Sequence, residues 1–232
     1  METIVALATP LGRSGIGVIR LSGADSLTIS RQLIKDENFS PQPRRATLKK
    51  IYEIESGELI DETIITYFQS PQSFTGEDVI EIASHGSPVI LRQIIDNCLK
   101  LDARMAEAGE FSFRALINGR MNLSQAEAIR DLIDAQTVAS ARQSIRQLRG
   151  EFSNQLQPLK DKLLNVIVVL ESTLEFVEDD LPEYQTAQIR QNLLGIADEL
   201  NKLASTFRAG KLLREGLKVA FVGRPNQVFS TL

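Results

Sequence analysis

The stretch IVALATPLGRSGIGVIRLS, residues 4–22, determines how the N-terminal part of this chain folds. Its two ends, Ile4–Ala8 and Val18–Ser22, are short apolar runs that predict β-strands. The glycine-rich segment between them, residues 12–17, predicts a tight turn. It does not match the G-x-G-x-x-G fingerprint of a dinucleotide site, and a strand rather than a helix follows it. The stretch therefore predicts a sheet-based domain.

Beyond this stretch, further helices and strands follow up to Asn118. Apolar spacing predicts a helix over Asp25–Lys35, and a later helix is expected to begin at Pro88 with Ser87 as its cap. Three more strands are expected, the first two forming a hairpin around residues 56–58: Ala46–Glu55, Leu59–Gln69 and Asp78–Ser84. The mixture predicts an α+β domain over residues 1–118.

The character of the sequence changes after residue 118. Ser124–Glu127 has the pattern of a capping box that opens a helix. Apolar residues three and four apart then predict one very long helix over Thr137–Val177, which Gly150 or Pro158 could kink or break. A second helix is expected over Thr186–Ala209, with Gly210 as its C-cap. Two long apolar seams predict antiparallel helices in a bundle over residues 119–214.

The last segment, residues 215–232, has the sequence pattern with which an α/β nucleotide-binding domain begins, namely its first strand and the loop that follows. The apolar run Leu217–Val222 leads into Gly223-Arg224-Pro225-Asn226. A phosphate loop needs glycine, lysine and serine or threonine at positions 228, 229 and 230, where this chain has Val228, Phe229 and Ser230. We therefore expect the chain, as it stands, to lack a working phosphate loop.

Composition narrows the class of protein. With 43% hydrophobic and 24% charged residues the chain is expected to be globular, and a net charge of −4 argues against bulk polyanion binding. One cysteine and one histidine cannot form an internal disulfide or a Cys/His zinc site. Cys98 lies in a helical apolar pattern and is expected to be buried. The first residues lack a signal peptide pattern and no segment predicts a membrane span, so we expect a cytoplasmic location with no membrane partner.

Two strands carry a charge within their apolar pattern. Alternation places Arg20 opposite Ile19 and Leu21, and Glu81 opposite Ile80 and Ile82. The two charges are either solvent-facing residues on a half-buried sheet or a cation and a carboxylate of a pocket. His85 lies at a junction between strand and helix, where it could bind a ligand or bond its own loop.

Charged residues also recur in the helical part. Arg142, Arg146 and Arg149 have helical spacing and could contact phosphates, although a solvated face is the more usual explanation. An acidic set could bind a divalent cation, but solvation is again favoured because no calcium loop is present: Glu171, Glu175, Glu178, Asp179, Asp180 and Glu183.

Five strings together resemble the MnmE/TrmE family of tRNA-modifying GTPases, in the same order and at similar intervals. They cover residues 4–22, 73–89 (SFTGEDVIEIASHGSPV), 109–127 (GEFSFRALINGRMNLSQAE), 128–135 (AIRDLIDA) and 213–226 (LREGLKVAFVGRPN). The resemblance implies a tetrahydrofolate-binding, aminomethyltransferase-like N-terminal domain that dimerises, then a helical domain, then the start of a Ras-like GTPase domain.

The resemblance also assigns roles. Arg20, Glu81 and Arg120 fall at positions that contact 5-formyl-tetrahydrofolate in the family, with 5,10-methylene-tetrahydrofolate as the other folate form. Asn226 is similar to a residue that helps hold an activating potassium ion, while no catalytic residue is assigned. The implied activity is GTP-, Mg²⁺- and folate-dependent modification of C5 of the wobble uridine of tRNA by a homodimer, together with an FAD-dependent MnmG/GidA-type partner.

The departures from the family pattern leave two other functions open. Because the phosphate loop is incomplete and most of the GTPase domain is missing, the sequence is interpreted as a truncated or partial version of a longer protein. A folate-dependent aminomethyltransferase-like protein is the first alternative, although the long helices argue against it. A non-catalytic dimerisation scaffold is the second.

Overall fold

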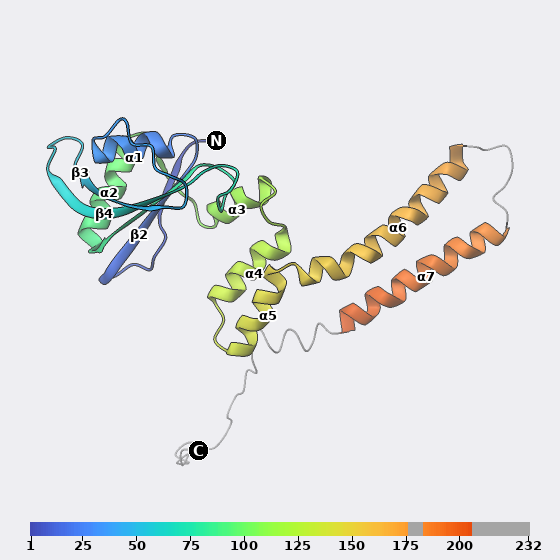
Figure 1. Cartoon of the computed structure of the whole chain (residues 1–232). Coiled ribbons are helices and arrows are strands. Elements are labelled where there is room, and N and C mark those ends of the chain that lie inside the picture. The colour runs from blue at the N-terminus through green and yellow to red at the C-terminus, as the bar shows by residue number, and fades with distance from the viewer. Residues whose placement is uncertain (176–182, 206–232) are drawn as a thin grey trace, which may run out of the picture. The chain divides into compact units, whose positions relative to one another are not determined.

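The computed structural model describes residues 1–175 and 183–205, and it divides into two compact units (Figure 1). The first unit is Met1–Ala126 and the second is Glu127–Leu232. Several predicted features lie outside the described residues, namely the Gly210 cap, the strand Leu217–Val222 and the segment that ends at Asn226.

The first unit contains a six-stranded mixed sheet in the order β3-β4-β5-β2-β1-β6. Every neighbouring pair is antiparallel except β1 and β6, which run parallel. The strands are β1 (Ile4–Leu7), β2 (Ser14–Ser22), β3 (Ala46–Tyr52), β4 (Leu59–Phe68), β5 (Val79–Gly86) and β6 (Arg104–Met105). The α+β class predicted for this part is confirmed.

Helices α1 (Ser26–Ile34) and α2 (Pro88–Lys100) contact each other and pack on one face of this sheet. That face is built from alternate apolar residues of the central strands, which are fully buried: Val5, Ile19, Leu21, Ile65, Ile80 and Ile82. The residues between them, Arg20 and Glu81 among them, lie on the opposite face, which no described helix of the unit covers to the same extent. The period-two pattern therefore separates an apolar core from an open polar face.

Four details of the first unit differ from the sequence predictions. The glycine-rich segment is only partly a turn, because β2 already begins at Ser14 and pairs with Gly86 through an irregular register. Helix α3 (Glu110–Ile117) and strand β6 were not predicted, since both are short. Ser87 occupies the N-cap position of α2, but its side chain makes no capping hydrogen bond.

The chain passes into the second unit through helix α4 (Leu123–Ile133). The predicted capping box at Ser124 is wrong by two residues, because the helix begins at Leu123 and Ser124 lies inside it. Asn122 Oδ1 instead accepts from the Gln125 amide at 2.9 Å, and Gln125 Oε1 accepts from the Asn122 amide at 3.0 Å. Asn122 thus caps the helix reciprocally with Gln125.

The predicted long helix is two helices, α5 (Val138–Leu148) and α6 (Glu151–Glu175). Gly150 has φ of +81°, a left-handed conformation that ends one helix and lets the next begin, whereas Pro158 lies inside α6. Helix α7 (Glu183–Ser205) runs antiparallel to α6, with Lys162 paired to Glu199 and with Val166 and Ile196 buried. Within the described residues, no helix combines the length and hydropathy needed to cross a membrane.

Candidate functional site

Arg20 and Glu81 are direct cross-strand neighbours on β2 and β5. Arg20 Nε and Nη2 both donate to Glu81 Oε1, at 2.9 and 2.5 Å, and each side chain is just over a quarter exposed. Within the described part of the chain, Glu81 Oε2 and Arg20 Nη1 make no hydrogen bond. The pair therefore keeps one free acceptor atom and one free donor atom.

The sheet leaves this pair accessible from its open face. In the register of β1, β2, β5 and β4, Ala6 lies beside Arg20 and Thr66 lies beside Glu81. Both neighbours have short side chains, so neither reaches over the pair. A ligand group could therefore approach the two free atoms without displacing a strand residue.

Two aromatic rings lie over the guanidinium of Arg20. Its Cζ atom is 5.8 Å from the ring centroid of Phe74 and 5.9 Å from that of Phe111. These distances are within the range of cation–π attraction, so the rings restrain the arginine. Phe74 remains 38% exposed, which leaves part of its ring available to a flat ligand.

Arg120 contacts the loop of residues 73–76 and makes no hydrogen bond or ion pair with Arg20 or Glu81 in the described residues. Its side chain is exposed, and its Nε donates to the carbonyl oxygen of Ser73 at 3.2 Å. A Cβ atom built at Gly76 would come 3.1 Å from Arg120 Cγ, so the stem of Arg120 packs on the same loop. The loop of residues 73–76 thus carries both Phe74 and the contact of Arg120. Phe74 links this loop to Arg20, which pairs with Glu81.

A buried ion network holds this loop and helix α3 in place. Arg114, whose side chain is 3% exposed, pairs with Glu77 at 2.9 Å and with Glu110 at 3.0 Å. Ser22, at the end of β2, donates to Glu77 at 2.8 Å and shares a hydrogen bond of 2.7 Å with Thr75. Because Phe111 lies on α3 beside Glu110, the network fixes one of the two rings over Arg20.

Glu110 is the acidic centre of this network. Hydrogen bonds from Arg104, the largest cause, and from the Glu107 amide and Arg114 outweigh the effect of burial and lower the pKa of Glu110 to about 2. The carboxylate therefore stays charged at neutral pH, which keeps both arginines paired.

His85 bonds to the protein rather than standing free. Its Nδ1 lies 2.8 Å from Asp61 Oδ1, and its backbone amide donates to Asp61 Oδ2 at 2.9 Å. The ring is 71% exposed, whereas Asp61 is almost fully buried. The structure thus places His85 against its own fold and leaves its outer edge in solvent.

Other candidates do not form sites within the described residues. Cys98 is buried in α2, which raises the pKa of its thiol to about 12, so it is not a nucleophile. No group of three or more histidine, cysteine, aspartate or glutamate residues suited to a metal occurs in the part of the chain that is described. Most of the predicted acidic set lies outside it, or has side chains that are not described.

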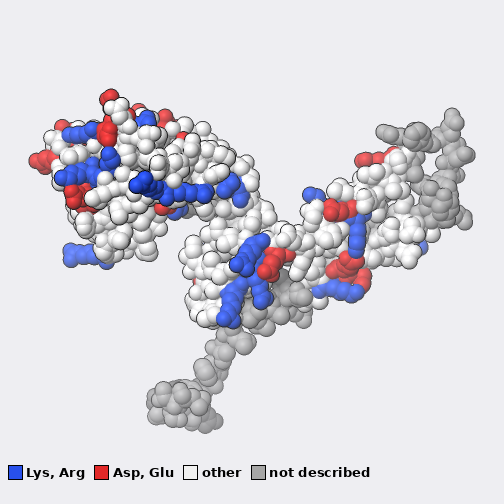
Figure 2. All heavy atoms as spheres, viewed as in Figure 1, with Lys and Arg blue, Asp and Glu red and all other residues white. Residues whose placement is uncertain are grey.

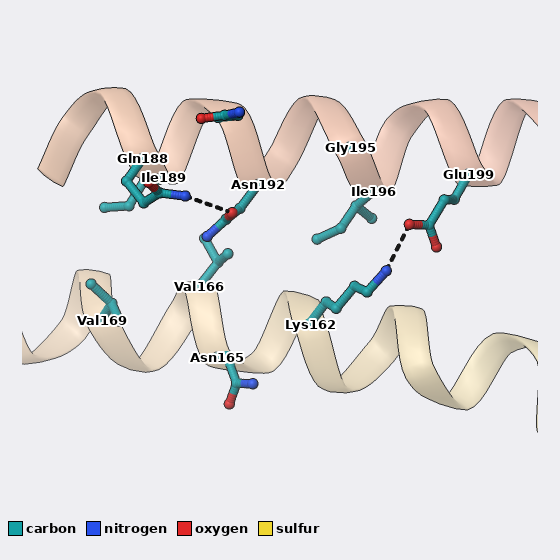
Figure 3. Close-up of a pocket in the computed structure, with 11 residues that line it drawn as sticks. Lys162, Asn165, Val166, Val169, Gln188, Ile189, Asn192, Gly195, Ile196 and Glu199 are labelled. Atoms are coloured by element: carbon teal, nitrogen blue, oxygen red, sulfur yellow. Dashed lines mark hydrogen bonds and ion pairs between the residues drawn. The ribbon is translucent and has the colours of Figure 1, made fainter. Parts of the chain in front are cut away.

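A separate groove of about 500 Å³ lies between α6 and α7 in the second unit (Figure 3). Its walls combine amides such as Asn165 and Asn192 with apolar residues such as Val166 and Ile196. The ion pair that spans it, Lys162 with Glu199, is about half exposed. The groove holds no buried polar pair comparable to Arg20 and Glu81, so the first unit carries the stronger candidate site.

Sequence reasoning missed the residues that support the site. Phe74, Glu77, Phe111 and Arg114 fall inside the strings SFTGEDV and GEFSFRALINGR, but only Arg120 was selected there. Glu110 and Arg114 are four residues apart, a spacing that predicts an ion pair on one helix face once a helix is recognised.

The fold and the site together define a class of protein: an α+β domain with a half-buried charged pair on its open face, followed by a helical domain. Residues 3–120 match the family described as "GTP-binding protein TrmE N-terminus", and residues 123–221 match "MnmE helical domain". The chain therefore belongs to the MnmE/TrmE family.

Curated relatives agree with this assignment along the whole chain. Proteins named tRNA modification GTPase MnmE are 43% identical in Koribacter versatilis (strain Ellin345), 44% in Azoarcus sp. (strain BH72) and 46% in Dechloromonas aromatica (strain RCB). Each match covers 100% of this chain and 50–51% of the relative. The chain thus spans about half the length of the relatives it matches.

Proposed function

We propose that this chain is the folate-binding and dimerising part of a GTP-dependent enzyme that modifies C5 of the wobble uridine of tRNA with an FAD-dependent MnmG/GidA-type partner. The single observation that carries the folate site is the pair Arg20–Glu81, which keeps a free donor and a free acceptor and has two aromatic rings over its arginine. The domain limits that go with this proposal are residues 1–118 for the folate domain, 119–214 for the helical domain and 215–232 for the start of the GTPase domain.

The residues around the pair fit a reduced folate, with 5-formyl- or 5,10-methylene-tetrahydrofolate as the two candidates. A pterin ring presents adjacent N–H donors, which a carboxylate oxygen such as Glu81 Oε2 can accept. Arg20 Nη1 suits a carbonyl or carboxylate oxygen, and the exposed Arg120 suits the negatively charged end of the ligand. Bound there, the folate would supply a one-carbon unit.

Calorimetry of the chain with 5-formyl-tetrahydrofolate tests this site. Glu81→Ala is expected to weaken binding by about 1–3 kcal/mol, because the N–H groups of the ligand lose their acceptor. Glu62→Ala is the matched control, since Glu62 lies on the same face of the sheet but is 55% exposed and pairs with Lys50. Unchanged affinity in both Glu81→Ala and Arg20→Ala would exclude this site.

The same titration separates the competing functions. A scaffold would bind no folate, whereas activity on a lipoyl-bound aminomethyl donor would favour an aminomethyltransferase. GTP, Mg²⁺ and the potassium ion near Asn226 belong in this proposal to the longer protein, because Phe229 occupies the position of the phosphate-loop lysine.

Dimerisation is proposed to use the first unit. Leu48 and Ile64 are cross-strand neighbours on β3 and β4, and they are 68% and 45% exposed on the open face of the sheet. Apolar side chains at such positions are suited to a protein interface. Light scattering should give twice the chain mass of 25.7 kDa, and Leu48→Glu with Ile64→Glu should give the monomer mass. A monomer at high micromolar concentration of the unaltered chain would contradict the proposal.

A further inference from the structure

Three arginines form a row along α5 that the folate site does not involve. Arg142, Arg146 and Arg149 are four and three residues apart, so they share one side of the helix over about 10.5 Å of its length. All three are exposed. We call this row the α5 arginine row.

The row lies on the side of α5 opposite to its packed side. Ser140 and Ser144 are the buried residues of the helix, at 7% and 6% exposure. With about 100° between successive residues, these serines and the α5 arginine row point in nearly opposite directions. Arg142 and Arg149 are therefore not packing residues, and Arg146 remains exposed although it lines a groove with Phe152 and Leu200.

The α5 arginine row has no acidic partner in the part of the chain that the structure describes. None of the three arginines pairs with an acidic side chain in residues 1–175 or 183–205. Residues 138–149 contain no acidic residue at all, and Asp134 and Glu151 lie beyond the two ends of the helix. Figure 2 shows basic side chains gathered over the part of the surface that α4 and α5 form, with an acidic group beside them.

Helix stability alone does not account for this arrangement. A cation in the last turn of a helix interacts favourably with the helix dipole, which explains Arg146 and the flanking Arg149. Arg142 is fifth of the eleven residues of α5, where that interaction is weak. Three like charges on one face also repel one another, so an external anion would relieve a cost that the helix bears.

We propose that the α5 arginine row is a contact site for the phosphate backbone of RNA. A guanidinium offers a planar set of donors that matches phosphate oxygens, and a row of them suits an anion whose charges follow one another along a chain. The proposal rests on the proposed function, which supplies the RNA substrate. It reconciles a chain of net charge −4 with a nucleic-acid ligand, because the contact is local.

Fluorescence anisotropy with a labelled, unmodified tRNA transcript tests the row on the whole chain. The triple variant Arg142→Gln, Arg146→Gln, Arg149→Gln should bind at least tenfold more weakly. The slope of its log affinity against log salt concentration should become shallower by an amount equivalent to about two phosphate contacts. The same three positions changed to lysine should retain most of the affinity, which separates charge from damage to the helix.

A charge-matched variant controls for net charge. Arg92→Gln, Lys160→Gln and Arg190→Gln remove three positive charges from exposed positions elsewhere. An equal loss in this variant, or no loss in the glutamine variant of the row, would overturn the proposal. So would row-dependent binding of a polyglutamate peptide as tight as that of tRNA, since the row would then fit an acidic protein.

Folate calorimetry on the same preparations keeps the two proposals apart. The glutamine variant of the row should bind 5-formyl-tetrahydrofolate as the unaltered chain does, because its substitutions lie outside the first unit. If the unaltered chain binds folate but not tRNA, only the proposal that the α5 arginine row contacts RNA is overturned. Absence of folate binding with row-dependent tRNA binding would overturn the folate site alone.

Discussion

The two units of this chain use charge in opposite ways. In the first unit Arg114 is buried and bonded to two carboxylates, and the network positions one ring of the candidate site. In the second unit, pairs such as Lys162 with Glu199 are about half exposed and join helices that already pack through apolar residues. A buried network whose partners come from distant segments fixes geometry, whereas an exposed pair adds little to it.

The largest expected effect that tests this contrast comes from Arg114→Ala. Removing the arginine leaves Glu77 and Glu110 close together and partly desolvated, so the first unit should lose about 3–5 kcal/mol of unfolding free energy. Denaturant unfolding measures the loss. Arg92→Ala, at an exposed position on α2, is the control and should change the free energy by less than about 0.5 kcal/mol. Equal losses of unfolding free energy in Arg114→Ala and Arg92→Ala would mean that buried and exposed charges stabilise the fold to the same extent.

A medium effect is expected from acid. The pKa of Glu110 is about 2 in the folded unit and near 4.5 in the unfolded chain. Between these two pH values the folded state therefore binds fewer protons than the unfolded state. The contribution is complete above pH 4.5 and is lost as the pH falls toward 2. Because Glu110 remains partly hydrated, we expect it to account for about 1–3 kcal/mol of unfolding free energy.

Unfolding curves of the unaltered chain and of Glu110→Gln between pH 6 and 2 check this expectation. The variant should be less stable at pH 6, and the difference between the two proteins should shrink toward acid. A difference that stays constant with pH would show that the carboxylate acts by shape rather than by charge.

The smallest effect is expected from Lys162→Ala in the second unit. Its ammonium group lies 2.6 Å from Glu199, but side chains that are 51% and 48% exposed form pairs worth about 0–1 kcal/mol. Thermal unfolding should therefore change little, and the small change should vanish at high salt. A loss comparable to that of Arg114→Ala would mean that this pair, too, fixes the geometry of its unit.

The strands were predictable because their signal is local. Alternation in Val18–Ser22 placed Arg20 on the face away from the core, and the structure has it there. Arg114 was not predictable as a buried residue, because its partner Glu77 is 37 residues away in the sequence. Helix α3 was missed because it has eight residues and its N-cap is Gly109, which has a φ of +79° and no side chain to give a capping signal.

In the helical part, too, local patterns were predictable and contacts between segments were not. Apolar spacing predicted the long seams, and Gly150 was named as a place where they could break. The start of α4 was misplaced since Asn122 and Ser124 are both good caps, and only the fold decides which of them meets a free amide. Aromatic rings over Arg20 come from a loop and a helix, so no pattern within one segment could have brought them together.

The register between β2 and β5 makes the first unit sensitive to insertions and deletions of a single residue. Arg20 faces Glu81, and Ile19 faces Ile82, on opposite sides of the same two strands. One residue added between Gly17 and Ile19 would move arginine to the core side and isoleucine to the open side. Length changes should therefore be tolerated in the turn before Ser14 and rejected within the strand, so the site and the core can be altered by substitution but not by a change in strand length.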